Sequence, residues 1–147
     1  MTIRHRTRII GLALLMATAL ALPAGASADS PLGKWRTFDP DTGAPKTVVE
    51  VTETDGTLTG TIVELLDDGE TTCSQCEGDR KNQPLLGMPV LWGLTNKGGE
   101  WSGGTILRPA NGKTANASLE LTDGGTKLEV TGSKGIMSRS QTWERVE

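Results

Sequence analysis

The chain has 147 residues, with 18 acidic and 15 basic side chains and a formal charge of −3. This length fits one domain with a single core. The acidic balance and the lack of any basic run after the N-terminus argue against nucleic acid or anionic lipid as a partner. The only histidine is His5, and tyrosine is absent.

The first 28 residues read as an export leader. A basic segment (4–8) precedes an apolar run (9–22), and small residues follow up to Ala28. The run is shorter than the roughly 20 apolar residues that span a bilayer, so we expect cleavage between Ala28 and Asp29. The expected product is a periplasmic or secreted domain of residues 29–147. It has no cysteine at the cut for a lipid anchor, no membrane insertion and a charge of −6, since the leader holds three arginines.

The position of His5 limits the chemistry of the mature domain. Without histidine there is no Ser-His-Asp or Cys-His site and no His-containing zinc site. An enzyme would have to use carboxylates, Lys, Arg or the two thiols. We therefore expect no catalytic site, no metal and no cofactor, and an enzyme is the less favoured class.

Short strand patterns separated by turn residues fill the mature chain. Asp55-Gly56, Asn111-Gly112 and the 123–125 segment are hairpin signals. Short connections of this kind are typical of an antiparallel up-and-down meander. The eight expected strands are 33–37, 46–53, 57–65, 90–94, 100–107, 114–121, 126–132 and 140–146.

Eight strands in so few residues either stack as a sandwich or close as a barrel. Closure alone removes exposed sheet edges. Gly60, Gly103 and Gly104 lie inside strands and suit the bends of a small barrel. We predict an all-β, eight-stranded barrel, with a sandwich as the alternative that pattern leaves open.

Several motifs together resemble a known family. Gly33-x-Trp35 opens the first strand and Arg145 ends the last, an arrangement that in lipocalin-like barrels closes one end by stacking Arg on Trp. With the motifs quoted below, the chain from about residue 31 to 146 resembles a bacterial exported family catalogued as domain of unknown function 2147, which is lipocalin-like. The further motifs are "CSQCEG" (73–78), "KNQPLLGM" (81–88), "LWGL" (91–94), "WSGGTI" (101–106), "PANG" (109–112) and "QTWER" (141–145).

One position departs from the family pattern. Ala115 stands where the resemblance implies an aromatic residue. If this position points inward, the interior differs in size or shape from that of the relatives.

Cys73 and Cys76 form a C-x-x-C pair with three interpretations. In an oxidising compartment two lone cysteines usually pair, which favours a structural disulfide. The redox interpretation needs a thiolate, and acidic neighbours such as Asp68 and Glu77 disfavour one. A zinc site lacks further ligands.

The apolar face of the strands is the expected interior. Trp35 is expected in the core, paired with Arg145, and small residues such as Gly60 leave room on the inner face. The candidates for lining a ligand cavity are Val49, Val51, Leu58, Ile62, Trp92, Trp101, Ala117, Leu119 and Leu128.

The longest connection, 66–89, has no periodicity and is the expected entrance or partner surface. Its candidate residues are Arg80, Lys81, Leu85, Leu86 and Met88. The sequence thus predicts an exported, disulfide-linked protein that holds a small, largely apolar ligand inside the barrel. The alternative is an envelope interaction or assembly protein acting through the 66–89 loop, and a redox or hydrolytic enzyme is less favoured.

Overall fold

A computed structural model describes residues 29–146. The expected leader, residues 1–28, lies outside the described residues, as does Glu147. The strands are β1 (Gly33–Phe38), β2 (Pro45–Thr54), β3 (Thr57–Leu65), β4 (Pro89–Lys97), β5 (Glu100–Arg108), β6 (Lys113–Thr122), β7 (Lys127–Lys134) and β8 (Met137–Arg145). Within the described range, the helical elements are two short 3-10 turns, η1 (Gly78–Arg80) and η2 (Asp123–Gly125).

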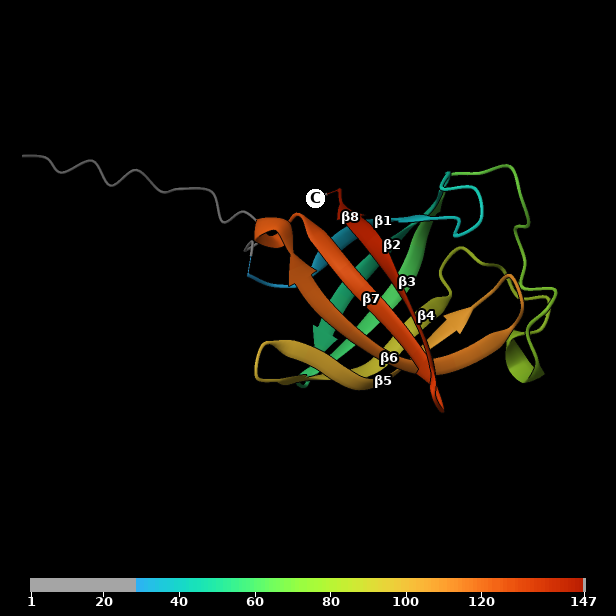
Figure 1. Cartoon of the computed structure of the whole chain (residues 1–147). Helices are drawn as coiled ribbons and strands as arrows, with labels where there is room; N and C mark the ends of the chain where they lie inside the picture. The colour runs from blue at the N-terminus through green and yellow to red at the C-terminus, as the bar shows by residue number, and fades with distance from the viewer. Residues whose placement is uncertain (1–28, 147) are drawn as a thin grey trace, which may run out of the picture.

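The eight strands pair in chain order and close into a barrel, β1 against β8 (Figure 1). Every pairing is antiparallel, as expected for strands joined by short turns. The predicted all-β up-and-down barrel is confirmed, and the sandwich alternative is wrong. Asp55 and Gly56, with φ of 52° and 77°, form the expected tight turn between β2 and β3.

The strands differ from the sequence prediction in two ways: one strand is longer than expected, and one ladder is irregular. β8 begins at Met137, ahead of the predicted 140–146 stretch, because a tight turn at Gly135 (φ 61°) lets β7 and β8 pair along their whole length. The β3–β4 ladder changes register between Leu58 and Thr59 and again between Gly60 and Thr61. Such bulges bend a strand and re-aim its side chains.

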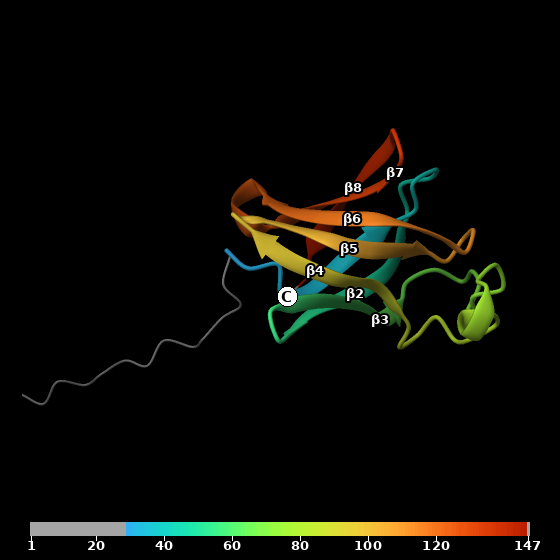
Figure 2. The ribbon, with the colours of Figure 1, turned by 90° about the horizontal axis from the view of Figure 1, so that it is seen from below.

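The connections divide the barrel into two ends. The β2–β3, β4–β5 and β6–β7 turns lie at one end, here called the floor end (Figure 1). The β1–β2 loop, the 66–88 connection and the β5–β6 and β7–β8 turns lie at the other, the open end. Figure 2 shows the 66–88 segment standing out beyond the strands at the open end. We call residues 66–88 the disulfide loop.

Most of the largest fully buried side chains lie toward the floor end. The fully buried side chains of the core interdigitate because inward positions recur at every second residue along each strand. The largest of them are Trp35, Leu58, Leu91, Leu94, Leu119 and Leu128.

Candidate functional site

The floor end is closed by a stacked pair from the first and last strands. The guanidinium carbon of Arg145 lies 4.2 Å from the centroid of the Trp35 ring. The guanidinium nitrogens donate hydrogen bonds to the carbonyls of Gly125 (2.8 Å), Leu32 (2.9 Å) and Ser30 (2.7 Å). Burial lowers the pKa of Arg145 from its ordinary value, and the carbonyls and ring replace part of its hydration. The predicted Trp35–Arg145 pair thus lies across the floor.

Side chains fill the floor end of the barrel, whereas the open end contains cavities. A cavity of about 170 Å³ is lined by residues of strands β1 to β5 and β8, and by Leu85 of the disulfide loop. Lys46 and Gln141 are among its polar contributors. Most of its inner wall is apolar, with Val49, Ile62, Leu85, Val90, Leu107 and Trp143.

A second cavity of about 260 Å³ adjoins the first on the side of β5 to β8. Ile106, Arg108 and Gln141 line both cavities, so they share a wall. The deeper part of the second cavity is apolar, with Ala115 and Val130. The two cavities therefore lie side by side at the mouth of the barrel, and we call them together the hollow.

Ala115 lies on the inner face and lines the second cavity. It is paired with Ile106 across the β5–β6 ladder, and an added Cβ on Gly132 would meet both side chains at ordinary contact distance. At this point Ala115 and Gly132, which have little or no side chain, lie next to Ile106. The departure from the family pattern falls in the cavity wall, where a larger residue would occupy part of the space.

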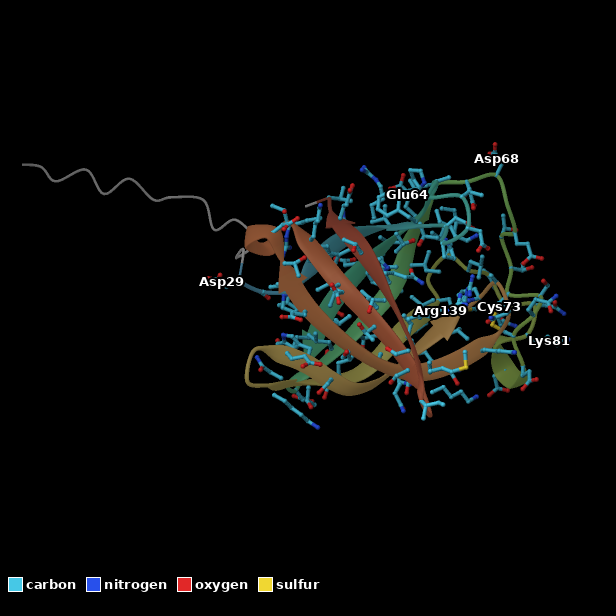
Figure 3. The ribbon with its side chains drawn as sticks, in the orientation of Figure 1. Asp29, Glu64, Asp68, Cys73, Lys81 and Arg139 are labelled. Carbon is cyan, nitrogen blue, oxygen red and sulfur yellow. A yellow bond between two sulfur atoms is a disulfide. The ribbon has the colours of Figure 1, made fainter. Side chains whose placement is uncertain are left out.

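The rim of the hollow is formed by the disulfide loop. Cys73 and Cys76 are bonded, which confirms the predicted disulfide, and both are buried. The loop pairs with itself through Cys73 N–H to the Gln83 carbonyl (2.8 Å) and Asn82 N–H to the Cys73 carbonyl (2.9 Å). Figure 3 shows Cys73 and Lys81 together at the open end.

The disulfide loop rests on the β5–β6 turn. The backbone of Gly112 lies against the Gln75 carbonyl and the Cys76 α-carbon, so closely that a side chain at Gly112 would collide with both. The Cys73 sulfur lies 3.7 Å from the Pro109 carbonyl oxygen. What the loop covers is therefore the turn that carries Arg108 and Pro109 into the cavity wall.

A third hollow of about 290 Å³ opens beside the first, between the disulfide loop and the β5–β6 turn. Its wall includes Lys46 and Asp67, which form an ion pair at 3.7 Å, and Glu70. Leu85 and Pro109 line this hollow and the first cavity alike. The rim therefore has an opening on the side where Asp67 and Glu70 lie.

The cavity candidates divide into two groups. Val49 and Ile62 line the first cavity. The aromatic candidates do not: Trp92 lies beneath Arg80, with 4.5 Å from guanidinium carbon to ring centroid, and Trp101 is half-buried toward the floor end. The register shift beside Thr59 pairs Trp92 with an outward-facing residue, which removes it from the interior. The others fill the core without lining either cavity: Val51, Leu58, Ala117, Leu119 and Leu128.

The candidates in the disulfide loop also divide. Leu85 is buried and lines the first cavity, and Met88 is buried in the core. Leu86 is 56% exposed, and Arg80 and Lys81 are exposed on the outer surface. Only Leu85 therefore contributes to the wall of the first cavity.

Some residues that line the hollow were not among the sequence candidates. Trp143 and Gln141 lie on the inner face of β8 and reach the first cavity. The other omissions are cations at the mouth: Arg108, Lys113, Lys134 and Arg139. We call these four residues the basic rim, and alternation along "KTANASLEL", in which Lys113 shares a face with Ala115, is the signal that could have found one of them.

Neither metal ligands nor a membrane-spanning helix stand out in the structure. Within residues 29–146, no three His, Cys, Asp or Glu side chains are grouped to hold a metal ion. No helix in that range is long and apolar enough to cross a bilayer.

Comparisons with known proteins agree with the fold. No curated protein matches the chain. Among solved structures, protein HP1028 from Helicobacter pylori, described as belonging to the lipocalin family, superimposes with a TM-score of 0.70 at 21% identity, over 80% of this chain and 84% of that one. At that identity the likeness shows the lipocalin-type barrel and nothing finer. The model of the family described as "uncharacterized protein conserved in bacteria (DUF2147)" matches residues 33–145, and the chain belongs to that family.

Proposed function

We propose that this protein is an exported binding protein that holds a small, largely apolar molecule in the mouth of its barrel. The observation that carries the proposal is the contrast between a filled floor end and a hollow, apolar-walled open end. Concave, mostly apolar sites with a few polar groups are typical of small-molecule binding. The lipocalin-type fold adds support by analogy of fold alone.

The size of the hollow limits the ligand. The cavities measure about 170 and 260 Å³, each below the roughly 300–1,000 Å³ of common ligand sites. Leu58, Leu91 and Leu119 block the path toward the floor. The ligand is therefore a slender molecule or one short chain, bound near the rim.

A binding assay with a neutral fluorophore tests the proposal. N-phenylnaphthylamine, uncharged and apolar, should bind saturably to the purified domain with a rise in emission. Ala115→Phe should weaken that binding at least tenfold by filling the second cavity. The matched control is Asn116→Phe, which adds the same ring at the neighbouring exposed position and should leave binding unchanged.

Thermal unfolding must show that both variants are folded. Absence of saturable binding by the unmodified protein would refute the proposal. So would equal binding by Ala115→Phe and Asn116→Phe, because the probe would then be attached elsewhere.

Export is a separate part of the proposal. It is supported by the pattern of the first 28 residues and by the buried Cys73–Cys76 bond, since such bonds persist in oxidising compartments. Intact-mass measurement of the protein from a periplasmic or culture-fluid fraction should give a chain beginning at Asp29. A cytosolic, uncleaved chain would contradict it.

The disulfide loop supports a second candidate function, that of an envelope interaction protein. Leu86 is more than half exposed on a loop that is closed by a disulfide, and Arg80 of the same loop lies over Trp92. A photo-crosslinking residue at position 86 should capture a protein partner in cells if this function holds. A matched crosslinker at exposed Lys97, at the floor end, should capture nothing.

A further inference from the structure

The four residues of the basic rim lie on the inner face of the barrel and line the second cavity. Along β8, Arg139 shares a face with Gln141 and Trp143, and Trp143 is buried in the core. Register carries this face across β7, where Gly132 pairs with Arg139 and Lys134 with Met137.

The same rule places the other two cations. On β6 and β5, Lys113 pairs with Arg108 and shares a face with Ala115, which lines the cavity. The basic rim thus consists of residues that the ladder turns toward the mouth. Figure 3 shows Arg139 toward the end of the barrel that carries Cys73 and Lys81.

The wall of the second cavity contains no carboxylate. Its lining includes all four residues of the basic rim, together with Asn111, Ser138 and Gln141, but neither Asp nor Glu. In the part of the chain that the structure describes, none of the four cations forms an ion pair. This is unexpected in a chain with more acidic than basic residues.

The acidic residues of the mouth line the first and third hollows, and two of them are paired with one lysine. Asp39 and Asp67 both pair with Lys46, at 3.4 and 3.7 Å. They line the first and third hollows, next to the β1–β2 loop and the disulfide loop. The charge of the mouth is therefore unevenly distributed: all four unpaired cations line the second cavity, and of these only Arg108 also lines the first.

Grouped like charges repel one another, and a bound anion relieves that repulsion. Below the rim the same cavity is apolar, through Ile106, Ala115 and Val130, and it adjoins the first cavity at Ile106 and Gln141. A ligand that matches both the cationic rim and the apolar wall below it has an anionic group at the rim and an apolar part inside. The basic rim would repel a cationic ligand, and a neutral ligand would leave its four positive charges unpaired.

We infer that the ligand is an amphipathic anion: a carboxylate or phosphate held by Arg108, Lys113, Lys134 and Arg139, with an apolar chain lying in the hollow. This inference rests on the proposed function, because it assigns the chemistry of the molecule held there. Guanidinium forks suit planar, bidentate oxyanions, and lysines add point charges.

The test compares probes that share one chain and differ in the head group. Dodecanoate, dodecyl phosphate, dodecanol and dodecylamine are used to displace N-phenylnaphthylamine from the purified domain near pH 7.5. We expect at least one of the two anions to displace the fluorophore about tenfold better than dodecanol, and dodecylamine to be the weakest. The preference should shrink as salt is raised, since exposed charges are screened. The carboxylate and phosphate arms identify which anion fits.

Charge removal at the rim gives the second arm. Lys134→Gln with Arg139→Gln should weaken the anion about tenfold and leave dodecanol unchanged. The matched control is Arg36→Gln with Lys97→Gln, which removes equal charge from positions that line neither cavity and should change nothing.

The outcomes separate the two claims. If dodecanol and both anions bind equally well, or if the rim and control variants behave alike, the anionic head group is wrong and the apolar site stands. If none of the probes, including the fluorophore, binds the unmodified protein, the proposed function falls and the inference falls with it.

Discussion

The backbone of Gly112 lies directly against the carbonyl of Gln75, with no room between them for a side chain. This contact joins the β5–β6 turn to the disulfide loop. Gly112 also has a φ of 68°, which L side chains rarely adopt. Two separate constraints therefore require glycine at one point of the rim.

Gly112→Ala should be far more destabilising than a glycine substitution that meets only the backbone constraint. Gly135 has a φ of 61° and nothing near its missing Cβ, so Gly135→Ala should cost about 1 kcal/mol. Gly112→Ala should cost about 3 kcal/mol or more, because the collision adds to the backbone term. Urea unfolding of both variants checks this, and equal losses would mean that the loop yields without strain.

Removal of the disulfide should loosen the rim without unfolding the barrel. Only four residues lie in the covalent ring from Cys73 to Cys76, so loss of the bond itself should cost about 2 kcal/mol, and burial of the hydroxyls in Cys73→Ser with Cys76→Ser adds to this cost. Hydrogen exchange should quicken in residues 66–88 and 109–112 and stay unchanged at the floor end. A cooperative loss of the whole fold would show instead that the bond holds the barrel together.

Arg145→Ala should open the floor. The substitution removes three charge-assisted hydrogen bonds and the stack on Trp35, which together predict a loss of about 3 kcal/mol. Arg145→Lys keeps the charge but not the planar fork, so it should recover only part of the loss. If the alanine variant matched the parent in urea unfolding, closure of the floor would have to depend on Trp35 packing alone.

The β1–β2 loop should lose order only in strong acid. N–H groups of Thr42 and Asp41 donate to the Asp39 carboxylate, both at 2.9 Å, and these bonds lower the pKa of Asp39 to about 2. Because the folded pKa lies below the unfolded value of about 3.9, the stabilisation is complete above that value and is lost as the pH falls through about 2. An NMR titration of the Asp39 carboxyl carbon measures this directly.

The matched variant for this titration is Asp39→Asn. The asparagine keeps an oxygen acceptor for the two N–H groups but cannot titrate. The NMR change that titration of residue 39 causes in the loop between pH 4 and pH 2 should therefore be missing from this variant. A parent protein whose Asp39 titrates near pH 4 would contradict the role of these hydrogen bonds.

Sequence reasoning predicted the barrel because the relevant signals are local. Turn residues such as Asp55-Gly56 mark the hairpins, and alternation in "TANASLEL" marks the inner face of β6. The Trp35–Arg145 pair followed from the family resemblance. The disulfide followed from the count of cysteines and the expected compartment.

The position of Trp92 could not be read from alternation. Gly93 has a φ of 77°, and the β3–β4 ladder shifts register next to it, so period-two counting fails across this point. The basic rim was missed for another reason: its residues come from four strands, and only the register of the ladders brings Arg108 and Arg139 to one cavity.

The closure between β1 and β8 has a consequence for how the chain folds. Seven ladders join neighbours in sequence, whereas this one pairs only Trp35 with Arg145 and Arg36 with Glu144. Local hairpins form early, and a contact that spans almost the whole domain pays the largest loop-closure entropy. We therefore expect the hairpins to form first and the β1–β8 pairing at Trp35 to form last. Refolding kinetics of Arg145→Lys should accordingly show faster unfolding with an almost unchanged folding rate.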